Sequence, residues 1–199
     1  EPRHTRSHEF TPSIQAVVSA TGRIFYIADK APTATLRKPA EWALVSRDAY
    51  NGLLLWERAI PEWFSHLCGW TSGPRQLQHK LVAVGDRVYV TLGFHDQVQA
   101  LDAATGETVM TYTDTHGADE ILYHNGILLL AIRTVTDERL TEYRKWADLT
   151  AQTESPLHIR DTAKPLVQAF RQAENKAPRM IIALNAATGQ TLWKKVGGA

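Results

Sequence analysis

The sequence is poor in cysteine, with Cys68 alone in 199 residues. An intramolecular disulfide and a thiolate-rich zinc site both need more thiols, so both are excluded within one chain. No apolar run approaches the roughly 20 residues that cross a bilayer. Charge of neither sign dominates, with 22 basic against 21 acidic side chains, which removes any bulk electrostatic case for binding nucleic acid or an anionic membrane.

Several familiar signatures are also missing. The sequence has no Walker loop, no glycine fingerprint for dinucleotides, no Gly-x-Ser-x-Gly elbow and no His-Glu-x-x-His pair. No methionine opens the chain and no signal peptide is visible, so we expect the numbering to start at a processed or truncated end. The composition, 44% hydrophobic and 22% charged, is that of an ordinary globular protein.

What the sequence does contain is an internal repeat. Residues 101–110 (LDAATGETVM) and 184–193 (LNAATGQTLW) match nearly position for position, and residues 47–56 (RDAYNGLLLW) form a weaker copy. An Asp or Asn side chain can accept hydrogen bonds from backbone amides two residues on, and glycine supplies a positive φ, so each copy predicts a tight hairpin. The predicted turn residues are Asp48, Gly52, Asp102, Thr105, Gly106, Asn185, Thr188 and Gly189.

A second hairpin precedes each copy of this motif, with turn residues at 21–22, 85–86 and 125–126. Each unit therefore consists of four short strands, A to D. A four-stranded antiparallel unit in tandem is typical of β-propeller blades, here predicted at about 14–60, 81–113 and 119–195. An ordinary antiparallel sandwich with a chance similarity is the alternative.

At these motifs the sequence resembles the PQQ-like β-propeller repeats of quinoprotein dehydrogenases and of an outer-membrane assembly lipoprotein. The pattern Ala-Leu-Asp-Ala-x-Thr-Gly-x-x-x-Trp is met by residues 100–110 and 183–193. The resemblance implies an all-β propeller of about three PQQ-like blades. It also implies that Trp56, Met110 and Trp193 dock neighbouring blades, with Met110 a departure that weakens or alters one contact. A periplasmic or exported location is implied by the resemblance alone.

The long connections all fall between strands B and C or between strands D and the next A, at 29–41, 61–80 and 134–179. Because antiparallel strands alternate in direction, these connections lie at one end of the propeller and the tight turns lie at the other. Binding residues concentrate on loops carried by a rigid scaffold, so we expect the binding face at the elaborated end. The alternative is that the insertions cap or pad the propeller or hold a neighbouring domain. Apolar periodicity at 137–150 and 162–175 predicts a helical hairpin within the third blade.

Aromatic and histidine side chains of these connections are the candidate ligand or partner contacts, namely Trp63, Phe64, His66, Trp70, His95 and His116. His95, Asp96, His116 and Asp119 come from short connections and could face one another, or they are scattered solvated residues. His66 and Cys68 could give two metal ligands if His79 or His116 came near. That set is incomplete, so no metal site is predicted, and Cys68 is interpreted as a packed apolar residue.

The leading functional prediction is a non-catalytic repeat scaffold that binds a protein or small ligand on its elaborated face, with no cofactor. One alternative is a segment of a PQQ- and Ca²⁺-dependent oxidoreductase. The resemblance there implies a quinone held by a ring of adjacent cysteines, which a lone cysteine cannot form. Another is a propeller module of a larger enzyme. Whether the protein is an enzyme stays open.

Propellers close with four to eight blades, so the expected partners are further blades of the same polypeptide or of another chain. A protein partner on the loop face is also expected, whereas nucleic acid and a transmembrane segment are not.

Overall fold

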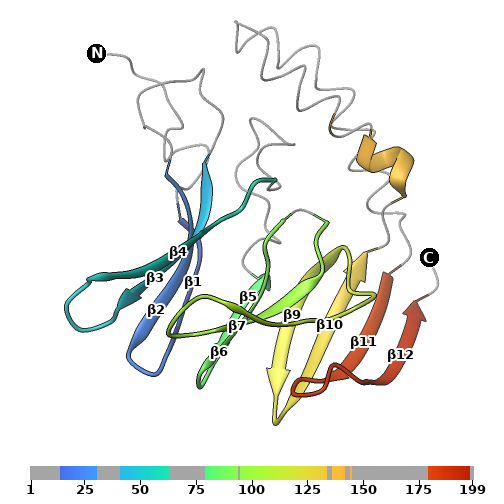
Figure 1. Cartoon of the computed structure of the whole chain (residues 1–199). Helices are drawn as coiled ribbons and strands as arrows, with labels where there is room; N and C mark the ends of the chain where they lie inside the picture. The colour runs from blue at the N-terminus through green and yellow to red at the C-terminus, as the bar shows by residue number, and fades with distance from the viewer. Residues whose placement is uncertain are drawn as a thin grey trace, which may run out of the picture.

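Three four-stranded antiparallel sheets follow one another along the chain, and within each sheet every strand pairs with the next one in sequence (Figure 1). The computed structural model describes residues 14–30, 41–62, 79–93, 95–133, 136–141, 144 and 179–197. The all-β repeat predicted from the sequence is therefore confirmed as three blade-like sheets. The described residues do not show a closed ring.

The bounds of the strands repeat the A-to-D order in each sheet. Blade 1 contains β1 (Ile14–Ala20), β2 (Arg23–Asp29), β3 (Trp42–Asp48) and β4 (Leu54–Ala59). Blade 2 contains β5 (Leu81–Val84), β6 (Arg87–Thr91), β7 (Val98–Asp102) and β8 (Thr108–Thr111). Blade 3 contains β9 (Ala118–His124), β10 (Ile127–Arg133), β11 (Arg179–Asn185) and β12 (Thr191–Gly197).

The apolar core lies between the sheets, because both faces of the inner strands carry apolar side chains. Phe25 and Leu44 of blade 1 pack in one cluster with Val88 and Leu101 of blade 2. A second cluster joins the opposite face of blade 2 to blade 3. Residues of this second cluster include Tyr89, Tyr112, Ile121, Leu128, Leu130 and Leu184. Each blade is therefore stabilised mainly by its neighbours, as in other repeat architectures.

The two tight turns of each blade are joined by one backbone hydrogen bond at the same place in the repeat. The N–H of Ala49 donates to the carbonyl of Gly22 at 2.9 Å, and the N–H of Ala103 donates to that of Asp86 at 2.9 Å. In blade 3 the N–H of Ala186 donates to the carbonyl of Gly126 at 2.8 Å. The A–B and C–D turns therefore lie together at one end of the blades, as the alternation of strand direction predicts.

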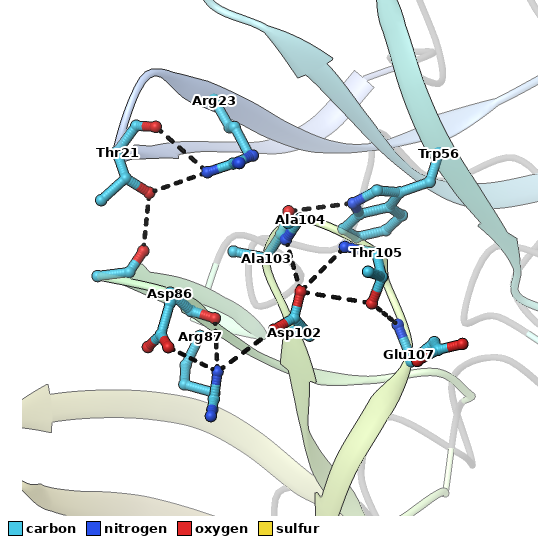
Figure 2. A network of polar contacts seen from close by, with 11 residues as sticks. Thr21, Arg23, Trp56, Asp86, Arg87, Asp102, Ala103, Ala104, Thr105 and Glu107 are labelled. Carbon is cyan, nitrogen blue, oxygen red and sulfur yellow. Dashed lines mark hydrogen bonds and ion pairs between the residues drawn. The ribbon is translucent and has the colours of Figure 1, made fainter.

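The turn between strands C and D is an Asx turn in every blade. Asp102 Oδ1 accepts hydrogen bonds from the N–H groups of Ala104 at 2.9 Å and Thr105 at 3.0 Å (Figure 2). Asp48 and Asn185 make the same pair of bonds in their own turns. These backbone N–H donors, Thr105 first and then Ala104, hold the pKa of Asp102 below its ordinary value. The glycine four residues after each of them has a φ between +74° and +75°, which explains why the repeat carries glycine there.

Trp56 of β4 docks blade 1 on the C–D turn of blade 2. Its Nε1–H donates to the carbonyl of Ala103 at 3.1 Å (Figure 2). A Cβ on Gly106 would lie 2.7 Å from the indole ring, so only glycine leaves room for it. Arg58, two residues further along β4, donates from Nη1 to the carbonyl of Gly106 at 2.6 Å. The two side chains together satisfy two carbonyl groups of the neighbouring turn.

The docking of blade 2 on the C–D turn of blade 3 differs, because Met110 stands where blade 1 has Trp56. The Met110 sulfur would lie 3.5 Å from a Cβ on Gly189, so a thioether replaces the indole over this glycine. A thioether has no N–H to donate. The hydroxyl of Tyr112 instead donates to the carbonyl of Ala186 at 2.5 Å, in the place that Trp56 Nε1 takes on Ala103. Tyr112 occupies the same position in blade 2 as Arg58 in blade 1. Arg58 pairs with Leu44 of strand C, and the N–H of Tyr112 donates to Val98, the residue of blade 2 equivalent to Leu44.

Trp193, the third expected docking residue, is 49% exposed and is not buried between blades. No blade follows it among the described residues, so its docking role stays a prediction.

The helical insertion predicted at 134–179 is not supported by the structure. Within it only 136–141, 144 and the first residue of β11 are described, and a helical stretch begins at Asp137 with Leu140 N–H donating to the Thr136 carbonyl at 3.0 Å. The rest of the expected hairpin lies outside the described residues.

Candidate functional site

Two of the six predicted contact residues, His95 and His116, lie in the part of the chain that the structure describes. His95 belongs to the connection between β6 and β7, and His116 belongs to the connection between β8 and β9. Both connections lie at the elaborated end of blade 2. The other four residues, Trp63, Phe64, His66 and Trp70, lie outside the described residues, as does Cys68.

The structure brings His95 and His116 into direct contact. Their rings stack with centroids 5.5 Å apart and planes 18° apart. His116 Nδ1 lies 2.8 Å from the carbonyl oxygen of His95. A carbonyl oxygen can only accept, so Nδ1 of His116 carries the proton and its Nε2 is the nitrogen left to accept when the ring is neutral.

The connection that carries His116 is held by a buried threonine. Thr115 Oγ1 donates to the Tyr112 carbonyl at 2.6 Å and accepts from the Val98 N–H at 2.8 Å. Because Thr115 is fully buried, both bonds are shielded from water. They fix the turn that presents His116 to His95.

The environment of His95 favours its neutral form. Burial lowers the pKa of His95, and the neighbouring His116 and Lys80 lower it further. A neutral imidazole can accept a hydrogen bond at one nitrogen and donate at the other. His95 therefore offers both hydrogen-bonding roles to a ligand at neutral pH.

A charged cluster at the same end consists of Lys80, Asp119 and Arg133, of which only Asp119 is among the residues that the sequence singles out. Arg133 Nε lies 2.8 Å from Asp119 Oδ2, and Lys80 Nζ lies 3.9 Å from Asp119 Oδ1. Both cations are 4% exposed, whereas the Asp119 side chain is 26% exposed. Buried charges of this kind are retained only when they are paired. No local pattern marks either cation in the sequence, because a lysine or arginine at the end of a strand is usually solvated.

Gly117 brings the histidine pair and this charged cluster together. Its N-terminal neighbour is His116, and its carbonyl accepts the Arg133 N–H at 3.0 Å. It has a φ of +76°, and a Cβ there would lie 2.3 Å from the Arg133 carbonyl oxygen and 3.4 Å from His95 Nε2. A side chain at this position would therefore push against both groups.

Ion pairs connect the surrounding segments. Arg144 donates from Nε to Glu62 Oε1 at 2.9 Å and from an Nη nitrogen to Oε2 at 3.1 Å. This two-pronged bond raises the pKa of Arg144 and links the insertion of blade 3 to the connection after blade 1. His79 Nδ1 lies 3.7 Å from Glu120 Oε1. The connection after blade 1 and segments of blades 2 and 3 thus meet at this end.

Within the described ranges, no group of three or more His, Cys, Asp or Glu side chains could hold a metal ion. No helix in those ranges is long and apolar enough to cross a membrane. The groups that are present can donate and accept hydrogen bonds and carry charge of both signs. Their arrangement suits recognition of a polar surface or ligand.

The family model for outer membrane protein assembly factor BamB matches residues 40–198. The chain belongs to this PQQ-like propeller family. Among solved structures, BamB from Moraxella catarrhalis is 13% identical and matches over 87% of this chain and 58% of its own, with a TM-score of 0.32. The chain thus spans 58% of the length of that protein. No curated protein sequence matches the chain.

Proposed function

We propose that this chain is part of a non-catalytic propeller scaffold that binds a partner protein at its elaborated end, around His95 and His116. The observation that carries the proposal is the cluster itself. A stacked histidine pair and the Lys80–Asp119–Arg133 group come from separate connections of blades 2 and 3 and meet at one end. The opposite end consists of tight turns whose polar groups bond one another.

The chemistry of the cluster favours binding over turnover. Asp119 is held by two buried cations, and the Nδ1–H of His116 is already bonded to a carbonyl. Groups that are fixed in this way present a constant pattern of charge and hydrogen bonds, which gives specificity to a docked surface. The description of the family as an assembly factor supports the same role, and a periplasmic location goes with it.

Site-specific photo-crosslinking tests this function. A benzoylphenylalanine is placed at exposed Asp96 beside the histidines, and in a matched control at exposed Glu107, in the C–D turn of blade 2 at the opposite end. In an extract of the source cells we expect one discrete adduct, identified by mass spectrometry as the same protein in repeated experiments, from position 96 alone. The adduct should weaken when His116→Ala is added. Equal adducts from both positions, or none from position 96, would contradict a binding face at this end.

A separate titration addresses the quinoprotein alternative. The chain is mixed with PQQ and Ca²⁺ while quinone absorbance and the thermal midpoint are followed together. A ligand that binds only the native state raises the midpoint by mass action. The scaffold proposal expects neither saturable binding nor a rise in the midpoint, and a clear rise would favour the oxidoreductase.

A further inference from the structure

Met110 places an oxidisable thioether at a position where the other two copies of the repeat carry an indole. It stands at the repeat position of Trp56 and Trp193, and all three residues pair with the same position of strand C. Met180 is the only other methionine in the sequence. Met110 therefore gives the contact between blades 2 and 3 a reactivity that the contact between blades 1 and 2 lacks.

Met110 lies at the outer edge of blade 2, where its side chain is only partly covered. β8 is the last strand of the sheet, and Thr108, Val109 and Thr111 around Met110 are exposed. The Met110 side chain packs against the apolar cluster between blades 2 and 3, and its sulfur faces Gly189 of the C–D turn of blade 3. The thioether thus lies at the rim of this interface and not deep inside it.

A C–D turn receives the neighbouring blade through its carbonyl groups. The carbonyl of Ala103 accepts the indole N–H of Trp56 (Figure 2). The carbonyl of Gly106 accepts a hydrogen bond from Arg58. Ala186 holds the place of Ala103 in the turn of blade 3. The side chains that cover such a turn therefore have to be donors or apolar, because an acceptor set against a carbonyl leaves both groups without a partner.

The surroundings of the Met110 sulfur suit a thioether and do not suit a sulfoxide. A Cβ on Gly189 would lie 3.5 Å from the Met110 sulfur and 3.7 Å from Tyr112 Cδ1, so the two side chains are neighbours over this turn. The Tyr112 hydroxyl already donates to the Ala186 carbonyl. A sulfoxide oxygen accepts hydrogen bonds and has no proton to donate. It would either face the turn without a donor or take the Tyr112 hydroxyl away from Ala186, and each outcome weakens the docking.

We propose that Met110 is a site of reversible oxidation, at which a sulfoxide loosens the contact between blades 2 and 3. The oxidant is hydrogen peroxide or another peroxide. The sulfur lone pair takes one oxygen as the O–O bond breaks, and the other oxygen leaves as water with the proton of the transferred one. Sulfur is oxidised by two electrons and the peroxide is reduced. Methionine sulfoxide reductases reverse the step, because two thiols become a disulfide and the sulfoxide oxygen leaves as water.

The interface that Met110 closes is also the one that joins the two blades of the candidate site. Lys80, directly before β5 of blade 2, meets Asp119 in β9 of blade 3 across this interface. The connection that carries His116 runs from β8 to β9, between the same two blades. Oxidation of Met110 therefore acts on the pair of blades that builds this site.

Peroxide treatment followed by urea unfolding tests the proposal, with peptide mass spectrometry to locate each added oxygen. In the unmodified chain we expect an oxygen on Met110 and a rise of about tenfold in the equilibrium constant of unfolding, the scale of a buried polar group that lacks its partner. Both classes of methionine sulfoxide reductase, one for each epimer of the sulfoxide, should restore the original constant with dithiothreitol as the source of thiols.

Two leucine variants separate Met110 from the other oxidisable groups of the chain. Met110→Leu keeps an apolar side chain of similar volume, and its stability should not change on peroxide treatment. Met180→Leu is the matched control, because Met180 packs against the same apolar cluster but lies at the other end of β11 from the C–D turn. This control should lose stability as the unmodified chain does. Oxidation of Cys68 would persist in both variants, so it cannot produce a difference between them.

Met110→Trp is a second oxidation-resistant chain, since it restores the indole of the repeat and an indole resists peroxide far better than a thioether. The comparison therefore does not depend on the folding of the leucine variant alone. A loss of stability in Met110→Leu and Met110→Trp equal to that of the unmodified chain overturns the proposal. A sulfoxide at Met110 that leaves the unfolding constant unchanged overturns it as well, and so does a Met110 that stays unoxidised while Met180 reacts.

Discussion

The indole of Trp56 and the backbone of Gly106 form the contact that fixes blade 1 on blade 2. The space that a Cβ would need on Gly106 is filled by the ring, at 2.7 Å, while the indole N–H bonds the carbonyl of Ala103 in the same turn. The glycine thus has two functions, since it permits a φ of +75° and leaves room for the neighbouring blade. Conformation and packing can be separated experimentally, because Gly189 shares the first function without the tight contact.

Gly106→Ala should destabilise the chain more than Gly189→Ala. Both substitutions place alanine at a φ of +74° to +75°, at a cost of about 1–2 kcal/mol each. Only alanine at position 106 also collides with a rigid indole, and overpacking of this kind costs about 1–3 kcal/mol more. The free energies of unfolding in urea measure the difference. Equal losses would show that Trp56 shifts freely and that the contact contributes little.

Tyr112→Phe should lower the free energy of unfolding by about 1–3 kcal/mol, because it leaves the Ala186 carbonyl without the hydroxyl donor at a buried site. Met110→Trp in the same chain should recover part of this loss, since an indole N–H can donate to that carbonyl as Trp56 does to Ala103. Met110→Trp in the original chain is the control and should not stabilise, because the carbonyl already has its donor. Failure of the double variant to recover any stability would argue against this exchange of donors.

The repeat was readable from the sequence because local chemistry dictates it. Asp102 and Gly106 are needed by the turn itself, and the apolar runs on both sides have the length of short buried strands. These determinants act over a few residues, so a single sequence is enough to place the strands. The family assignment rests on the same local pattern and is confirmed by the match over residues 40–198.

Contacts between distant segments could not be derived in the same way. Nothing near Tyr112 in the sequence indicates that its hydroxyl reaches Ala186 in the next blade. Lys80 and Arg133 were also missed, because a single cation before or after a strand is usually solvated. Their burial depends on Asp119, which approaches only when blades 2 and 3 pack. The sequence also left open whether His95 and His116 face each other or are scattered solvated residues, because their contact depends on how two separate connections pack.

Asp102→Asn should make the chain less sensitive to acid. The N–H groups of Thr105 and Ala104 lower the pKa of Asp102 in the folded state, so its stabilising contribution is complete above the ordinary pKa near 3.8 and is lost as pH falls through the lower folded value. An asparagine accepts the same bonds without titrating, as Asn185 does. Thermal midpoints between pH 5 and pH 2.5 measure the effect. The reciprocal Asn185→Asp should steepen the loss, and identical slopes in all three chains would contradict the explanation.

The stability of the chain should fall between neutral and mildly acidic pH because of His95. Its pKa is lowered in the folded state by burial, by His116 and by Lys80, whereas in the unfolded state it returns to about 6.5. The unfolded chain therefore binds more protons in this range, and the stabilising contribution, complete above the unfolded value, declines as pH falls toward the folded one. Urea unfolding at intervals from pH 8 to pH 5 measures the dependence of stability on pH, which His95→Gln should reduce.

His116→Gln should also reduce this dependence, because the stacked ring is the second cause of the lowered pKa of His95. His124→Gln removes an exposed histidine at the turn end and serves as the control. If the control changes the slope as much as His95→Gln does, the pH response does not originate in the stacked pair.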